Sequence, residues 1–212
     1  MRHIALLAVL LLAVTHSVYP QVNDVQTALA SMDKLAVGLK TLSFRFRLSS
    51  VDGQNVKETH RGIVRVAGLE SGDYEALVEV ERPAGGRFYY KGLELLILDS
   101  ATKEKNTMAL QEYAALVSLF KPLMLGTAGK RVADVYDITA TGSETIGGVA
   151  ATKLELRPKS AEARSQVEKV DLWVPAKGGF PLRLEMMFSS MMRFEFSDVA
   201  VNPKLPDRLR PQ

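Results

Sequence analysis

Few side chains in this sequence have the types and spacing that acid–base catalysis requires. Two carboxylate pairs, Asp134 with Asp137 and Glu168 with Asp171, would suit a general acid and a general base. Spaced acidic pairs also arise by chance in a chain that carries 24 Asp and Glu residues. His60 lies in a polar stretch, which is typical of an exposed or half-exposed structural histidine. We therefore expect none of these groups to be catalytic, and we expect no enzyme.

Metal and cofactor chemistry has even fewer candidates. The chain has no cysteine, which excludes disulfides, thiolate metal sites and cysteine nucleophiles. Of its three histidines, His3 and His16 lie in an N-terminal segment that we expect to be removed, so a multi-histidine site is excluded. The sequence holds no phosphate-binding loop, dinucleotide fingerprint, zinc-protease motif or nucleophile elbow. We expect no metal and no cofactor.

The informative side chains are apolar and alternate along two neighbouring segments, residues 182–188 and 192–196. Alternation places such side chains on one face of a strand pair. They are Leu182, Leu184, Met186, Phe188, Met192, Phe194 and Phe196. Four of the chain's eight methionines lie between residues 186 and 192, and methionine adapts to varied apolar partners. Such a face suits either an ordinary core or a cavity that opens to take a flexible lipid chain.

The charge distribution gives little support to nucleic-acid binding. The formal net charge is +3, and the basic residues are scattered along the chain. No run of five Lys or Arg occurs, and aromatic residues are not interleaved with a basic stripe. We expect no nucleic-acid partner.

The first residues have the three-part layout of a secretory signal peptide. Residues 1–3 are short and positive, residues 4–14 are eleven consecutive apolar residues, and residues 15–17 are small or polar. A helix of that length rises only ~16 Å, too little for the ~30 Å hydrocarbon core of a membrane. We expect a cleaved signal over residues 1–17 and an exported single domain over residues 18–212. An N-terminal membrane anchor is the alternative.

The elements that would position the apolar side chains are mostly strands, because alternation with a period of two dominates the chain. It is found in ten segments, at residues 44–48, 61–66, 74–80, 86–91, 93–98, 135–141, 149–156, 170–174, 180–188 and 191–197. Trp173 is out of phase with Leu172 and Val174, so we expect it on the opposite face of its strand. The absence of βαβ alternation predicts an α+β, mainly β fold with one large antiparallel sheet, strongly curved or half-closed.

Two segments have apolar residues at helical spacing instead. Residues 25–39 predict one amphipathic helix, and residues 108–125 predict a second helix that Pro122 kinks or ends. The apolar face of the second helix holds Leu110, Tyr113, Val117 and Phe120. We expect both helices to cover one side of the sheet.

In the order of its weak motifs, the chain resembles the periplasmic outer-membrane lipoprotein-sorting, or LolA-like lipoprotein carrier, family. The resemblance runs over essentially the whole exported chain. An N-terminal helix leads into Phe44-Arg45-Phe46, and a strand with the pattern Gly-Ile-Val-Arg-Val follows at residues 62–66. The more specific part is C-terminal, where residues 170–174 lead to residues 179–185, and residues 196–199 lead to residues 201–207.

This resemblance implies a strongly curved, incomplete antiparallel β-barrel of about ten strands, with a helical lid enclosing a hydrophobic cavity. To the apolar strand pair above we add, as cavity residues, Phe44, Phe46, Leu48, Val64 and Val66. The lid residues are those of the 108–125 face. In the family an Arg-Pro pair latches the lid; here Arg82 precedes Pro83, one strand later than the family pattern, and is the possible latch.

The function implied by the resemblance is carriage of acylated lipoproteins across the periplasm, from an inner-membrane ABC transporter to an outer-membrane receptor, by a monomer. Hiding an acyl chain from water is worth about 0.8 kcal/mol per CH₂, so a long chain needs a protein cavity to cross an aqueous compartment. A signalling module of the same fold, which senses lipid or lipoprotein and acts through a partner protein, is the second hypothesis. A periplasmic hydrolase ranks last.

Overall fold

The structure is a computed structural model that describes residues 22–69, 71, 74–83, 85–124, 129–187 and 190–211. The expected signal peptide at residues 1–17 and the expected cavity residue Phe188 lie outside the described residues. All statements below concern the described residues.

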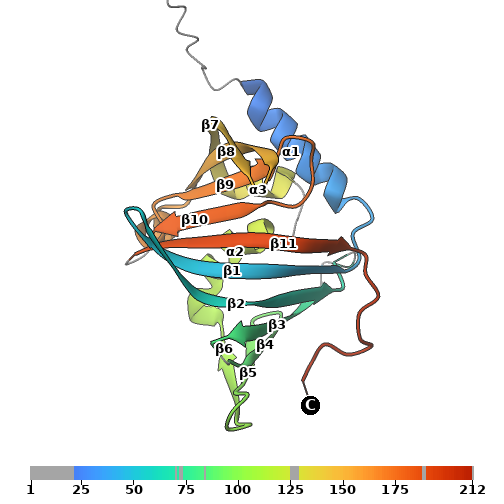
Figure 1. Ribbon diagram of the computed structural model, residues 1–212. Helices are drawn as coiled ribbons and strands as arrows, with labels where there is room; N and C mark the ends of the chain where they lie inside the picture. The colour runs from blue at the N-terminus through green and yellow to red at the C-terminus, as the bar shows by residue number, and fades with distance from the viewer. Residues whose placement is uncertain are drawn as a thin grey trace, which may run out of the picture.

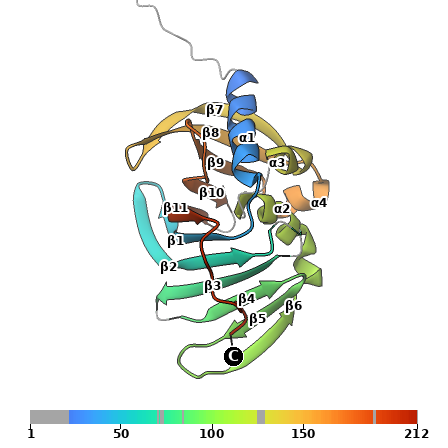
Figure 2. The ribbon, with the colours of Figure 1, turned by 90° about the vertical axis from the view of Figure 1, so that its right-hand side faces the viewer.

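Eleven strands form one antiparallel sheet, in the order β6-β5-β4-β3-β2-β1-β11-β10-β9-β8-β7. Along the chain they are β1 (Leu42–Asp52), β2 (Asn55–Ala67), β3 (Glu75–Arg82), β4 (Arg87–Lys91), β5 (Glu94–Leu98), β6 (Lys105–Ala109), β7 (Tyr136–Ile146), β8 (Val149–Pro158), β9 (Val170–Pro175), β10 (Arg183–Met187) and β11 (Met191–Val201). The first and last strands pair at the centre, and β6 and β7 are the two edges. The sheet curls without closing, which confirms the predicted mainly β, incomplete barrel (Figures 1 and 2).

The helices gather on one side of this curled sheet (Figure 2). They are α1 (Val22–Ala36), the 3₁₀ turn η1 (Gln111–Tyr113), α2 (Ala114–Met124), α3 (Gly129–Val135) and α4 (Ala161–Gln166). The predicted N-terminal helix is confirmed as α1, which buries Ala28, Leu29 and Met32. It ends just before Gly38, whose φ of 69° a helix cannot continue.

The second predicted helix is shorter than expected. Residues 105–109 form β6 and pair with β5, so Met108 lies in a strand and is 39% exposed. The chain then turns through η1, and the α-helix begins only at Ala114. Pro122 lies in the last turn of α2, two residues before the helix ends. Residues 108 and 109, which helical spacing alone assigned to the helix, therefore belong to the edge strand β6.

The main hydrophobic core lies between the inner, concave face of the sheet and the helices. Helices α1 and α3 meet closely there, because a Cβ added at Gly129 would collide with the backbone of Leu29. A smaller cluster lies on the outer face, where the C-terminal tail buries Leu209 against Leu77, Tyr89 and Leu96. The tail therefore covers part of the outer face, and the helices cover the inner one.

Asn202 fixes the connection between the first helix and the first strand. Its side-chain oxygen accepts hydrogen bonds from the backbone N–H groups of Lys40 at 2.7 Å and Thr41 at 3.2 Å. Its side-chain nitrogen donates to the carbonyl of Gly38 at 2.9 Å. The end of β11 thereby holds the segment through which α1 enters the sheet.

Candidate functional site

The register of the strands decides which side chains share the inner face. Phe46 lies opposite Gly62 on one side and Phe196 on the other, and Phe44 lies opposite Val64. Directly opposed residues of antiparallel strands point to the same face. The alternating residues of β1, such as Arg45, point outward. The sequence-predicted cavity residues of β1, β2, β10 and β11 within the described residues therefore do line one face.

On the β7–β10 side this face is packed as a core. Leu184 is 0% exposed and Met186 is 4% exposed, and both belong to the main core cluster. Phe44, Phe180 and Phe196 form an aromatic cluster, with ring centroids 4.8 to 5.6 Å apart. The helices cover this half, so these side chains supply the stable part of the inner face.

Other predicted residues are less covered. Leu48, Leu182, Met192 and Phe194 are only half-buried, whereas Val64, Val66, Phe44 and Phe46 are buried. Leu48, Met192 and Phe194 pack against the edge of the core rather than within it. Packing thus loosens from β10 toward the tips of β1 and β11.

The inner face is also only partly covered over β3, β4 and β5, in residues that were not predicted as cavity residues from the sequence. Six apolar side chains there share the face by register and are all half-buried. These six, which we call the open inner face, are Val78, Val80, Phe88, Tyr90, Leu95 and Ile97. Their period-two pattern was present in the sequence, but alternation does not say which part of a sheet the helices leave uncovered.

Helix α2 lies over the inner face, behind β11, β1 and β2 in Figure 1. It buries Leu119 and Leu123 in the core, with Leu116 and Phe120 packed at the edge of the core. Of the predicted lid residues, Phe120 therefore points inward. Val117 is half-buried.

The other two predicted lid residues precede the helix. Tyr113 is 48% exposed in the 3₁₀ turn, and Leu110 is buried, its N–H bonded to the carbonyl of Leu93. Of the four residues predicted to share one helical face, only Val117 and Phe120 belong to the α-helix.

A lysine and two tyrosines meet where α2 borders the open inner face. The Lys121 ammonium lies 4.6 Å from the centroid of the Tyr74 ring, and this ring stacks on Tyr90 at 5.8 Å between centroids. Burial, with the hydrogen bond to Tyr90, raises the pKa of the Tyr74 hydroxyl far above its usual value. Tyr74 therefore remains protonated and neutral.

Arg82, the possible lid latch, is exposed at the end of β3. The contacts recorded within the described part of the chain include no hydrogen bond or ion pair from its guanidinium to a helix. The residue before it, Glu81, pairs with Arg45 on β1 at 2.8 Å.

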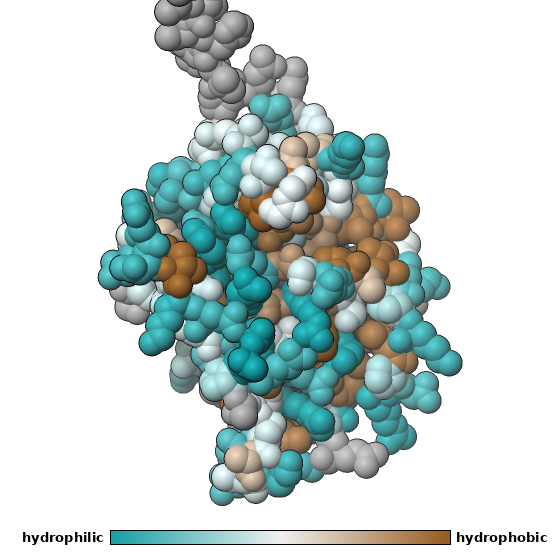
Figure 3. All heavy atoms as spheres, in the orientation of Figure 1, coloured by the Kyte–Doolittle hydropathy of each residue, from teal (hydrophilic) through white to brown (hydrophobic). Residues whose placement is uncertain are grey.

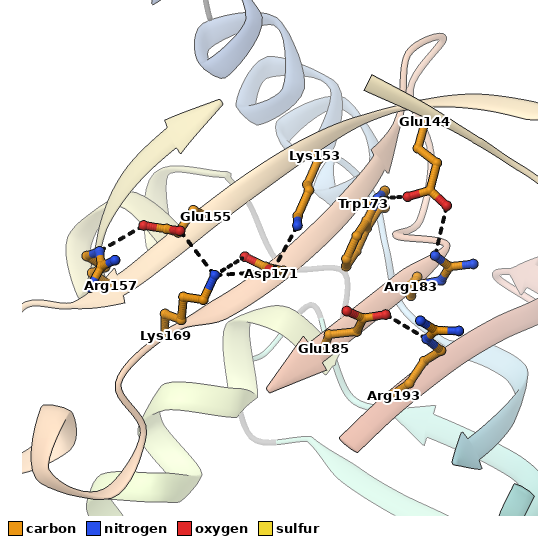
Figure 4. A network of polar contacts seen from close by, with 10 residues as sticks. All are labelled: Glu144, Lys153, Glu155, Arg157, Lys169, Asp171, Trp173, Arg183, Glu185 and Arg193. Carbon is orange, nitrogen blue, oxygen red and sulfur yellow. Dashed lines mark hydrogen bonds and ion pairs between the residues drawn. The ribbon is translucent and has the colours of Figure 1, made fainter. Parts of the chain in front are cut away.

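Trp173 lies on the outer face, as its phase in the sequence predicts. Its indole N–H donates to Glu144 at 2.9 Å, and the ring is flanked by Lys153 and by Arg183 (Figure 4). Arg183 also pairs with Glu144 at 3.0 Å. Trp173 thus ties the β7–β8 hairpin to the outer side of β9 and β10.

The outer face continues as a ladder of paired charges (Figure 4). Asp171, which is 6% exposed, pairs with Lys153 at 3.0 Å and Lys169 at 3.4 Å. Lys169 also donates to Glu155, which accepts a further hydrogen bond from Arg157. Figure 3, which looks onto the outer face, shows a mostly hydrophilic surface over β1, β2 and β11. The sheet is therefore polar outside and apolar inside.

An outer groove of about 460 Å³ lies between these strands and the β7–β8 turn. Its wall includes Arg45, Arg47 and Arg61. These arginines are already paired with carboxylates, for example Arg47 with Glu58 at 3.2 Å. The groove therefore offers no uncompensated cluster of positive charge.

The groups that could have carried catalysis are dispersed. His60, Asp134 and Asp137 are exposed, and Asp171 is engaged with lysines. Within the described ranges, no group of three or more His, Asp or Glu could hold a metal ion. The helices of that same part of the chain include none long and apolar enough to cross a membrane.

No protein-family model matches the chain, and no curated protein matches it either. Solved structures do match. The Mycobacterium tuberculosis lipoprotein LppX is similar at a TM-score of 0.53 and 14% identity, over 88% of this chain and 100% of LppX. The Pseudomonas aeruginosa MucA/MucB complex is similar at a TM-score of 0.51 and 14% identity, over 89% of this chain and 61% of the matched chain.

A LolA superfamily protein from Nitrosomonas europaea is also a structural neighbour, at a TM-score of 0.43 and 16% identity, over 87% of this chain and 96% of that chain. At these identities the comparisons establish architecture only. The chain shares its fold with LppX and with the matched part of MucB, and in this chain that fold is an open, curled antiparallel sheet whose inner face is partly covered by helices.

Proposed function

We propose that this protein is a non-enzymatic carrier that binds acyl chains on the inner face of its curled sheet. The observation that carries the proposal is the open inner face: six neighbouring apolar side chains, half-buried, beside a packed core and bordered by α2. A contiguous apolar surface that is left partly uncovered is typical of a ligand-binding surface.

The energetics favour a long flexible chain as the ligand. Each buried CH₂ contributes about 0.8 kcal/mol, and the half-buried side chains gain further burial when the chain covers them. The packed β7–β10 half keeps the protein folded while the open half exchanges ligand. Phe44, Phe46, Leu48 and their neighbours on β2, β10 and β11 extend the apolar surface inward from the open inner face, so they would line its deeper part.

The proposed biological setting follows the sequence resemblance. Residues 1–17 serve as a cleaved signal peptide, and residues 18–212 act as one periplasmic domain. The cargo is the acyl part of lipoproteins, received from an inner-membrane ABC transporter and passed toward an outer-membrane receptor. The protein works as a monomer, and no step requires a metal or cofactor.

A lipid- or lipoprotein-sensing module is the second candidate, because one similar structure is a complex of MucB with another protein, MucA. In that case ligand binding on the inner face would change the affinity for a partner protein. A carrier instead gives its ligand up to an acceptor.

Mass spectrometry of molecules that copurify with the protein from its own periplasm tests the proposal. We expect acylated molecules with the wild type and at least several-fold less with Ile97→Asn, which places an amide on the open inner face. Leu93→Asn is the control, since Leu93 is 41% exposed and lies outside that face. Preparations of folded wild-type protein that contain no acylated molecule, and that bind none when it is added, would contradict acyl-chain carriage.

A further inference from the structure

Lys121 differs from the other half-buried lysines of the described chain. Lys153 and Lys169 lie on the outer face and each pairs with a carboxylate. Lys121 lies on α2 at the inner side, and no carboxylate of the described residues is recorded within ion-pair distance of its ammonium. Its recorded partner is the π face of Tyr74, which attracts a cation but supplies no negatively charged oxygen. A partly desolvated cation of this kind is well suited to an external anion.

The surroundings of Lys121 are those of a boundary between polar and apolar surface. Tyr74 is 7% exposed and stacks on Tyr90. Tyr90 in turn belongs to the open inner face, where it lies opposite Leu95. Because the Tyr74 hydroxyl stays protonated, it is neutral and does not repel an anion. A charged group at Lys121 would therefore adjoin the apolar surface proposed for the acyl chain.

Resting on the proposed function, we infer that Lys121, with the Tyr74–Tyr90 pair, binds the anionic headgroup of an amphiphile whose chain lies on the open inner face. The ligand class is thereby narrowed to molecules with a carboxylate or phosphate at one end of an acyl or alkyl chain. The chain supplies most of the affinity through burial. The headgroup contact supplies the preference for anionic over neutral ligands and fixes the direction in which the chain lies.

Displacement of a neutral fluorescent dye separates this inference from the proposed function. N-phenyl-1-naphthylamine carries no charge at neutral pH, so its binding reports the apolar surface alone. Dodecanoate, dodecyl phosphate and dodecanol, which share one chain length, are then compared as competitors below their micelle-forming concentrations. We expect the wild type to bind the dye, and at least one of the two anions to displace it at about ten-fold lower concentration than dodecanol.

Substitutions of Lys121 test whether this residue causes the preference for anionic over neutral competitors. We expect Lys121→Gln to remove the advantage of the anions while leaving the affinities for dye and dodecanol within about two-fold. Lys121→Arg should retain the advantage of the anions, because arginine keeps the positive charge. Lys130→Gln is the control, since Lys130 is an exposed lysine on α3. A thermal transition recorded for each variant shows that it is folded.

The outcomes are distinct. If only dodecanoate displaces the dye at a lower concentration than dodecanol, the ligand carries a carboxylate. If only dodecyl phosphate does so, the ligand carries a phosphate, and if both do so, the site accepts either anion. Each of these three results supports the inference. Dye binding with equal displacement by all three competitors overturns the headgroup site and leaves the acyl carrier intact. Absence of dye binding and of displacement contradicts the proposed function itself. If Lys121→Gln fails to fold, equal displacement of the dye from the wild type by all three competitors still overturns the headgroup site.

Discussion

Side chains on the outer side of the sheet make polar contacts, whereas side chains on the inner side make apolar ones. On the outer side Trp173, Asp171 and Glu155 are held by hydrogen bonds and ion pairs that join β7, β8 and β9. On the inner side Met186 and Leu184 are packed, whereas Phe88 and Ile97 are half-buried. Charged contacts therefore lie on the outer side of the sheet, and the inner side is mostly apolar among the described residues.

The outer ladder makes folding stability depend on pH in the acidic range. Partial burial opposes ionisation of Glu155, but hydrogen bonds from Lys169 and Arg157 outweigh it and lower the pKa of its carboxyl below the usual 4.5. A folded pKa below the unfolded one gives stabilisation that is present above the unfolded pKa and is lost as pH falls through the folded pKa. We expect Glu155→Gln to be less stable than wild type near neutral pH, and the difference to shrink as the pH falls below the usual pKa of a glutamate and through the lowered pKa of Glu155 in the folded protein.

Urea unfolding at a series of pH values measures this difference. Glu168→Gln is the matched control, because the side chain of Glu168 is 82% exposed and lies 3.7 Å from Arg157. We expect this control to track the wild type within about 0.5 kcal/mol at all pH values. A Glu155→Gln variant whose deficit persisted unchanged in acid would show that the charge of Glu155 is not the cause.

The site could be predicted from the sequence only in part, and the limits are physical. Alternation correctly placed Phe44, Phe46 and Leu184 on the inner face and Trp173 on the outer one, because strand geometry fixes the face. It did not separate packed positions such as Leu184 from open ones such as Ile97. That distinction depends on where the helices lie, which is a tertiary property.

At the scale of elements, long patterned segments were predictable and short or polar ones were not. The ten expected strands are found, with shifted ends, and α1 is confirmed. Strand β6 was missed because Lys105–Ala109 has little apolar alternation and pairs only as an edge. Helices α3 and α4 were missed because seven and six residues are too few for a helical period to be recognised.

Helix α2 is the element we expect to move when ligand binds. Its backbone hydrogen bonding is interrupted by Pro122, and Leu116 and Phe120 are only half-buried, whereas every residue of β9 is buried. We expect the amides of α2 to exchange hydrogen faster than those of β9 and β10, and their exchange to change when a fatty acid is added. Equally slow exchange in all three elements, with or without ligand, would rule out a movable α2.

For the whole molecule, curvature and incomplete cover together create the proposed site. The β7–β10 half is closed by α1, α3 and part of α2, while β3–β5 carry an apolar face with less cover. The central pairing of β1 with β11 joins the two halves into one sheet. A stable half and an open half in one domain would allow a ligand to enter and leave without unfolding the core.

The most direct measurement is a titration of the folded protein with a fluorescent long-chain fatty acid, compared across two aromatic substitutions. We predict that the wild type binds the probe saturably at micromolar or lower concentration. Phe88→Asn should bind it at least roughly ten-fold more weakly, because it places an unpaired amide on an apolar binding face. Trp173→Phe, which alters only the outer face, should leave binding unchanged. Thermal transitions recorded alongside must show that both variants are folded. Wild-type protein that shows no saturable binding up to the solubility limit of the probe, or binding that Trp173→Phe abolishes while Phe88→Asn leaves it intact, would contradict a lipid site on the inner face.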